Sequence, residues 1–367
     1  MNNYWKESVN IILVSPTLTS IDGSVKCDYD VLTIGGTASA GSLQSASYVL
    51  PGGQLDASDF SYNWWQLFDR LGVSSTSLDS FSASVSQRPP IITENLLVDE
   101  LKRCSSNSEE VLVDTDIALR ICAIRHVFQQ TGLLLVNYLR ILLVHRKSHK
   151  YVDKNQTIEY RKRVTQSPQL FPEMCETFDL LPDLWSLNEW WNWLTPSSVG
   201  RSPRFDTMYY LCALDSQQPS MSGQLWSSPV TLLNNRHNGH YILSPIHVYE
   251  LSRLLNFETI VGLKEFARKR QIEGVQRWQP ILTMYTDGAI ATLPGDDYYP
   301  TRVEVFADKQ AQSYSLSLRE MRAKSCRLNR IELMGTNSDV VVNIDMPSKH
   351  IRPVCQYYER HTICANL

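Results

Sequence analysis

Residues Ile121–Val136, ICAIRHVFQQTGLLLV, predict a helix that ends at Gly132 and passes into a strand. Apolar side chains recur at helical spacing along one face: Ile117, Ile121, Ile124 and Phe128. On the opposite face His126, Gln129 and Gln130 fall at i, i+3 and i+4, so they gather at one place. The rest of that face is apolar, which predicts a helix buried between layers, with the polar cluster turned inward or lining a cleft.

The composition indicates a globular protein. The chain has 367 residues, of which 43% are hydrophobic, so it can bury a full core. Its net charge of -3 gives no overall basic field, and we expect no nucleic-acid partner. Eight cysteines occur without a C-x-x-C pair, which favours a reducing intracellular compartment over a zinc ribbon or a disulfide framework.

Helical and strand-like patterns alternate along the chain, so we predict an α/β (α+β) fold. The expected strands are 8–15, 29–34, 133–144 and 205–214. The expected helices are 59–71, 94–104, 116–131, two pieces within 156–180, 245–255 and 258–274. A hairpin is expected at 280–286 and 289–293, with its turn at Asp287-Gly288.

The composition changes after residue 72. Seven of the thirteen residues from Ser74 to Ser86 are serine, and we interpret 72–110 as a long surface insertion, partly flexible, with one helical piece. The predicted organisation is a main domain over 5–300 that carries this insertion, and an extension over 301–367 packed on the same domain.

The opening stretch also resembles a family motif. Arg125, Val127, Gly132 and Leu133 match the end of the Nudix box, G-x5-E-x7-R-E-U-x-E-E-x-G-U, in which U is bulky and aliphatic. Pro51-Gly52-Gly53-Gln54 resembles the segment that Nudix folds place before the box. Five further motifs resemble the acyl-coenzyme A diphosphatase branch, the nucleoside diphosphate-linked moiety X motif nineteen type: RICAIR, WLTP, RFDT, LWSSP and LPGDDYY.

The resemblance covers nearly the whole chain and implies a Nudix α/β/α sandwich. It also implies a substrate class, because members cut the pyrophosphate of coenzyme A or acyl-coenzyme A to adenosine 3',5'-bisphosphate and 4'-phosphopantetheine products. In the family, Mg²⁺ or Mn²⁺ held by glutamates serves this reaction. Such cations neutralise charge on the phosphates and activate water.

At the glutamate positions of the R-E-U-x-E-E core this chain has His126, Gln129 and Gln130. Neutral amides and an imidazole are poor ligands for Mg²⁺, so no bound metal is expected. Loss or strong reduction of hydrolysis, with a retained ligand- or protein-binding role, is the favoured hypothesis. An active hydrolase whose ligands come from elsewhere, such as the loop 219–224, is the alternative. An interaction protein that uses the Ser-rich segment is a third possibility.

Other residues are weaker candidates. Contact with coenzyme A, the possible small-molecule partner, is expected at Gly52, Gly53 and Arg204, with a basic turn at Arg146, Lys147, His149 and Lys150 as a further candidate. The tryptophans between Trp185 and Trp193 favour core packing over adenine stacking. Asp296 and Asp297 are interpreted as a surface acid pair after a turn, and His237 and His240 as parts of a polar loop.

The chain ends suggest a compartment. The N-terminus lacks the features of a signal peptide, and no apolar stretch is long enough to span a membrane. Ala365-Asn366-Leu367 is similar to the peroxisomal tripeptide, with Asn in place of the basic residue. Peroxisomal location is therefore favoured, and the mitochondrion is the alternative.

Overall fold

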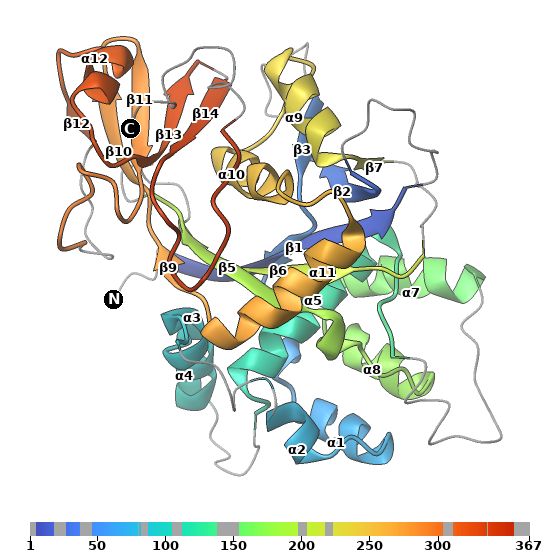
Figure 1. Cartoon of the computed structure of the whole chain (residues 1–367). Helices are drawn as coiled ribbons and strands as arrows, with labels where there is room; N and C mark the ends of the chain where they lie inside the picture. The colour runs from blue at the N-terminus through green and yellow to red at the C-terminus, as the bar shows by residue number, and fades with distance from the viewer. Residues whose placement is uncertain are drawn as a thin grey trace.

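A mixed sheet of nine strands forms the centre of the molecule in the computed structural model (Figure 1). The structure describes residues 5–17, 27–36, 46–79, 81, 87–104, 112–137, 154–196, 204–216, 223–303, 311–335 and 337–355. The main path of the sheet is β8-β3-β2-β1-β6-β5-β9, and β4 and β7 pair with β1 and β2. The bounds are β1 Trp5–Pro16, β2 Tyr29–Gly35, β3 Ala46–Val49, β4 Gly52–Gln54, β5 Asn188–Leu194, β6 Arg204–Ala213, β7 Gln224–Ser227, β8 Tyr241–Ile242 and β9 Arg277–Trp278.

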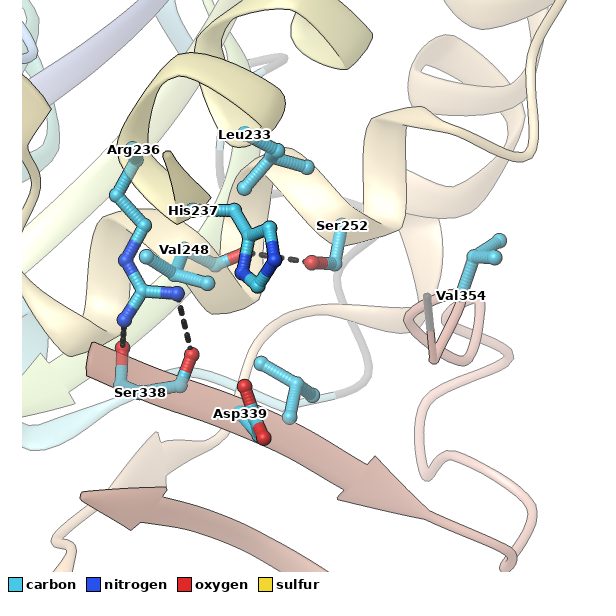
Figure 2. A pocket seen from close by; sticks show the side chains of 9 residues that line it. Leu233, Arg236, His237, Val248, Ser252, Ser338, Asp339 and Val354 are labelled. Atoms are coloured by element: carbon cyan, nitrogen blue, oxygen red, sulfur yellow. Dashed lines mark hydrogen bonds between the residues drawn. The ribbon is translucent and has the colours of Figure 1, made fainter. Parts of the chain in front are cut away.

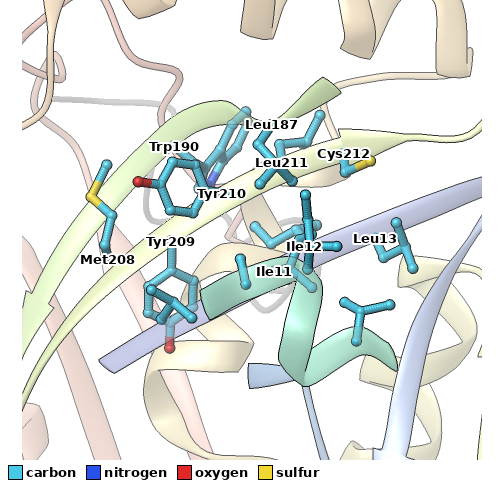
Figure 3. Packing of buried hydrophobic residues seen from close by; sticks show 14 of the residues in the cluster. Ile11, Ile12, Leu13, Leu187, Trp190, Met208, Tyr209, Tyr210, Leu211 and Cys212 are labelled. Carbon is cyan, nitrogen blue, oxygen red and sulfur yellow. The ribbon is translucent and has the colours of Figure 1, made fainter. Parts of the chain in front are cut away.

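Helices cover both faces of this sheet. Tyr210 in β6 lies under the guanidinium of Arg120 in α5, whereas its neighbour Tyr209 faces His247 in α10. Because successive residues of a strand point to opposite faces, α5 and α10 lie on opposite sides. Both layers therefore bury β1 and β6, which pair in parallel from Trp5–Arg204 to Val14–Ala213. Figure 3 shows the resulting apolar packing around these two strands.

The helices have the following bounds: η1 Ala57–Phe60, α1 Asn63–Arg70, α2 Ser75–Asp79, α3 Pro90–Thr93, α4 Leu96–Cys104, α5 Thr115–Thr131, α7 Lys154–Gln166, α8 Leu170–Thr177, η2 Leu184–Ser186, α9 Pro229–His237, α10 Pro245–Leu254, α11 Ile260–Arg270, η3 Gln271–Glu273 and α12 Leu318–Ala323. None of the helices in the described ranges is both long and apolar enough to cross a bilayer. The predicted helices and the Asp287-Gly288 hairpin are confirmed, with shifts of a few residues at their ends.

A second sheet of five strands follows in the order β12-β10-β11-β13-β14. Its bounds are β10 Ile281–Tyr285, β11 Gly288–Thr292, β12 Gln312–Ser313, β13 Asn329–Met334 and β14 Asn337–Val342. Arg236 of α9 reaches across to β14 and donates to Ser338 O and Oγ at 2.7 and 2.8 Å (Figure 2). A cavity of about 30 Å³ lies beside this contact, which is room for one or two water molecules.

Three sequence expectations are wrong in the described residues. His237, expected in a polar loop, is the last residue of helix α9. The segment 133–137 makes only one isolated bridge, between Val136 and Pro182, so the expected strand 133–144 does not form there, and 138–144 lies outside the described residues. Asp296 is not a surface acid. Both of its carboxylate oxygens accept from Arg330 at 2.6 Å, and Asn329 N donates to it at 3.0 Å, so it ties the LPGDDYY turn to β13.

The tryptophan-rich segment belongs to the core, as predicted. Trp190, Trp191 and Trp193 are fully buried in β5. The indole N–H groups of Trp190 and Trp193 donate to the carboxylate of Glu250 at 2.6 and 2.7 Å, so their polar atoms are satisfied inside the protein. The segment after residue 72 also contributes to the core in part, because Leu78 and Ile91 are buried. The proposed domain boundaries and the insertion stay predictions.

Candidate functional site

Helix α5 brings the predicted polar cluster against β4. It starts after Asp114 and ends at Gly132, whose φ of 76° is the left-handed conformation that closes many helices. Most of its side chains are buried on both sides, as the double apolar pattern predicts. His126, Gln129 and Gln130 lie near its C-terminal end, and the structure brings His126 and Gln130 against Gly52–Gln54 of β4.

Gln130 binds both backbone groups of Gly52. Its amide nitrogen donates to Gly52 O at 2.7 Å, and its side-chain oxygen accepts from Gly52 N at 3.0 Å. Gly52 also leaves no room for a side chain, because a Cβ there would lie 2.1 Å from Val9 O. An amide matches this donor and acceptor pair, whereas a carboxylate offers acceptors only.

His126 makes a similar contact with the backbone of Gln54, two residues after Gly52. Its Nε2 lies 2.9 Å from Gln54 O, which is an acceptor, so Nε2 carries the proton. The ring covers Gly53 so closely that a Cβ there would lie 2.3 Å from the ring carbon Cε1. Burial, together with the charge of Arg125, lowers the pKa of His126 to about 4, so the ring is neutral at pH 7.

Arg125 forms a buried ion pair beneath the cluster. Its Nε and one terminal nitrogen donate to the two oxygens of Asp59 at 2.7 and 2.6 Å. Burial alone would lower the pKa of Arg125, but Asp59, together with Cys122 and Asp56, raises this pKa above its ordinary value. Arg125 also donates to Gln129 Oε1 at 3.1 Å and to Gln54 O at 3.2 Å. It therefore fixes the cluster to β4 and η1.

Gln129 turns toward the neighbouring helix. Its amide nitrogen donates to Val164 O of α7 at 2.8 Å. In return, Arg161 of α7 donates to the backbone oxygens of Gln129 and Gln130 at 2.9 and 2.5 Å. These bonds satisfy carbonyl groups at the end of α5, where the helix itself provides no partners.

The cluster does not fit a hard divalent cation. Each of the three side chains is neutral and already hydrogen-bonded to the protein, and the carbonyl oxygens of Gly52 and Gln54 accept protein donors. Mg²⁺ and Mn²⁺ prefer carboxylate and water oxygens. Within the ranges that the structure describes, no group of three or more His, Cys, Asp and Glu residues is arranged to hold a metal ion.

A cavity of about 310 Å³, the Gln54 cavity, lies beside the cluster. It is lined by Trp5, Lys6, Glu7, Gln54, Leu55, Leu96, Leu97 and Glu100. Glu7 is buried, and its carboxylate accepts from Leu96 N and Leu97 N at the start of α4, at 2.7 and 3.1 Å. Burial raises the pKa of Glu7 to about 7. A mixed apolar and polar cavity of this size is suited to a small ligand.

The remaining predicted site residues are dispersed. Arg204 is buried with its guanidinium 5.7 Å from the centre of the Trp5 ring, and it pairs with Trp5 on β1. Gly53 pairs with Val9, which is four residues from Trp5 on β1. Arg204 and Gly53 are therefore about 13 Å apart along the strand. The basic turn Arg146–Lys150, the residues 219–222 and the tripeptide 365–367 lie outside the described residues.

The sequence did not reveal Glu7, Asp59 or the carbonyl of Gln54 as parts of this site. The sequence around Asp59 could have indicated its role, because Asp56 and Asp59 have the spacing of a capping box around η1. The second acid of such a box can also accept from another side chain. Glu7 had none, because its partners Leu96 N and Leu97 N lie 89 and 90 residues further along the chain. The backbone partners depend on tertiary contacts alone.

The contact of α5 with the Gly52–Gln54 strand agrees with the resemblance of both segments to a Nudix fold, and comparison with known proteins shows the family. The family model described as the NUDT19 Nudix domain matches residues 5–254, and the model of the NUDT19 C-terminal domain matches 282–343. The chain therefore belongs to the NUDT19 family of Nudix proteins.

Relatives match over most of their length. The acyl-coenzyme A diphosphatase NUDT19 of Xenopus laevis is 31% identical, with 96% of this chain and 97% of the relative covered. The protein of the same name from Gallus gallus is 30% identical over 96% of this chain and 95% of the relative. A crystal structure of a Nudix hydrolase from Alicyclobacillus acidocaldarius has a TM-score of 0.45 at 15% identity, covering 71% of this chain and 95% of that one.

Proposed function

We propose that this chain is a member of its family that has lost, or strongly reduced, metal-dependent pyrophosphate hydrolysis and retains a ligand-binding role. One observation carries the proposal. The side chains at the three glutamate positions of the box, His126, Gln129 and Gln130, are neutral and hydrogen-bonded to the protein. A metal bound there would have to break these bonds without a carboxylate to compensate.

The ligand that we propose is coenzyme A or an acyl-coenzyme A, because the relatives are named acyl-coenzyme A diphosphatases. The Gln54 cavity is the proposed place of contact, since it adjoins the cluster and has both apolar and hydrogen-bonding walls. Gly52, Gly53 and Arg204 stay candidates for this contact. The proposed location is the peroxisome, which import of a fluorescent fusion ending in Ala365-Asn366-Leu367, compared with one lacking them, would test.

Two measurements on the purified full chain test the proposal. Coenzyme A is incubated with Mg²⁺ or Mn²⁺, and release of adenosine 3',5'-bisphosphate is followed by chromatography. Binding of coenzyme A is measured by calorimetry with and without EDTA. We expect no release above the protein-free control and binding that EDTA leaves unchanged. Metal-dependent release would instead favour the alternative, an active hydrolase with ligands from other segments.

A variant pair locates the binding site. Leu97 is half-buried in the wall of the Gln54 cavity, and Leu97→Trp would fill part of it. We expect this change to weaken coenzyme A binding at least tenfold, about 1.4 kcal/mol. Val261→Trp is the control, because Val261 is 70% exposed on α11. Equal affinity in both variants would argue against the Gln54 cavity as the place of contact.

A further inference from the structure

A second and larger cavity lies at the carboxyl end of β6. Its volume is about 510 Å³, and its walls come from the segment after α5, η2, the first residue of β5, the end of β6 and helices α11 and η3. We call it the α11 cavity. β6 runs parallel to β1 up to the pair Val14–Ala213, and ligands of open α/β sheets commonly bind at the carboxyl ends of such strands. The volume is in the range of small-molecule sites.

One wall of the α11 cavity is apolar. It contains the four consecutive residues Leu133–Val136, together with Trp185 and Leu214. Leu135 and Val136 are buried, whereas Leu133 and Leu134 remain partly exposed beside the cavity. Leu133 and Leu134 pack against the core from its edge, so part of their apolar surface still faces the cavity. Covering such a wall with an apolar chain would remove it from water.

The mouth of the α11 cavity is cationic. Lys264 and Arg268 line it from positions i and i+4 of α11. Lys264 pairs with Asp215 at 2.8 Å, but their side chains are 53% and 92% exposed, so the pair contributes at most about 1 kcal/mol. Arg268 has no ion pair or hydrogen bond within the described residues, because the nearby Glu265 pairs with Lys269.

The other acid of the α11 cavity, Asp183, is less exposed than Lys264 and Arg268 at the mouth. Asp183 lies in the wall, where Asn137 donates to it at 3.4 Å. Burial raises the pKa of Asp183, which disfavours its charged form. The arrangement is thus an apolar wall that leads to a guanidinium at the mouth, and it is complementary to a molecule with an apolar chain and one anionic end.

We propose that the α11 cavity binds a monocarboxylate with an unbranched apolar chain, of the fatty-acid type. The chain lies against Leu133–Val136, and the carboxylate meets Arg268, which can form two parallel hydrogen bonds with it. This site is separate from the Gln54 cavity and requires neither hydrolysis nor coenzyme A. It therefore goes beyond the function proposed above.

The test is calorimetry of the full chain with decanoate and with decanol, which has the same chain and no charge. We expect decanoate to bind with a stoichiometry of one and more tightly than decanol. Arg268→Ala should weaken the binding of decanoate at least tenfold and leave the affinity for decanol unchanged. Lys269→Ala is the matched control, because Lys269 is the next residue on α11, is 70% exposed and does not line the cavity.

A second variant tests the apolar part. Ala213 lines the α11 cavity at the end of β6, and Ala213→Phe would occupy part of its volume. This variant should bind both decanoate and decanol more weakly, while its circular dichroism spectrum stays that of the parent protein. Absence of decanoate binding, equal effects of Arg268→Ala and Lys269→Ala, or full binding by a folded Ala213→Phe protein would each overturn the proposal. Displacement of decanoate by decanoyl-coenzyme A, but not by coenzyme A, would also overturn the proposal, because the thioester has no fatty-acid carboxylate for Arg268.

Discussion

The side-chain amide of Gln130 and the backbone of Gly52 form a closed pair of hydrogen bonds, at 2.7 and 3.0 Å. The pair joins the last turn of α5 to β4, 78 residues earlier in the chain. Gly52 presents one backbone donor and one backbone acceptor side by side, so the neutral amide of Gln130 suits this position.

We expect Gln130→Glu to lower the free energy of unfolding by about 1–3 kcal/mol at pH 7, because the carboxylate cannot donate to Gly52 O and leaves that acceptor unpaired. Chemical denaturation with urea measures the effect. Gln66→Glu is the matched control, since Gln66 is exposed on α1 and the same change there should stay within about 0.5 kcal/mol. Equal stabilities of the two variants would contradict the role assigned to the pair.

The pKa of His126 gives a prediction on the acid side. It falls from 6.5 to about 4 in the folded state, so the unfolded chain binds a proton more readily. Stability contributed by the neutral ring is present above pH 6.5 and is lost as the pH falls toward 4, by up to about 3 kcal/mol. His126→Asn should flatten the stability profile in that window, whereas His240→Asn, at an exposed position, should not.

The pKa of Glu7 predicts a pH dependence of stability opposite to that of His126. Burial raises its pKa from 4.5 to about 7, so the folded state holds the proton more firmly than the unfolded chain. Its contribution is present below pH 4.5 and is lost as the pH rises through 7, by about 2–3 kcal/mol. In Glu7→Gln this loss should disappear, so the variant gains stability relative to the parent as the pH rises. Glu100→Gln, at an exposed residue of the same cavity, should follow the parent curve.

The buried pair Asp296–Arg330 gives a stability prediction in the second sheet. Asp296→Asn leaves the buried guanidinium without its carboxylate and should cost about 3–5 kcal/mol. The neighbouring Asp297 is a natural control, because it accepts only backbone N–H groups, from Cys326 and Arg327, at an exposed position. Asp297→Asn keeps an acceptor oxygen and should cost less than about 1 kcal/mol. Thermal unfolding of the two variants would show the difference.

Much of the architecture was predictable from local pattern. The double apolar face of α5 predicted a buried helix, and the spacing of His126, Gln129 and Gln130 predicted their meeting. The segment 133–137 was mispredicted, because a run of apolar residues can line a cavity as well as build a strand.

The partners of the cluster were not predictable in the same way. Gly52 O, Gln54 O and Val164 O are backbone atoms, and any residue could supply them. The burial of Asp296 was missed for a related reason. Its partner Arg330 lies 34 residues further on and has no periodic relation to it.

The close packing of the His126 ring on Gly53 has an evolutionary consequence. Substitutions at positions 126 and 130 are not independent of β4, and substitutions at position 129 are not independent of α7. A single glutamate introduced at one of them would first lose a bond to the protein, and the carboxylate of Asp59 close by is already paired with Arg125. The positions are therefore epistatic, and their exchange for glutamates one at a time would pass through less stable intermediates.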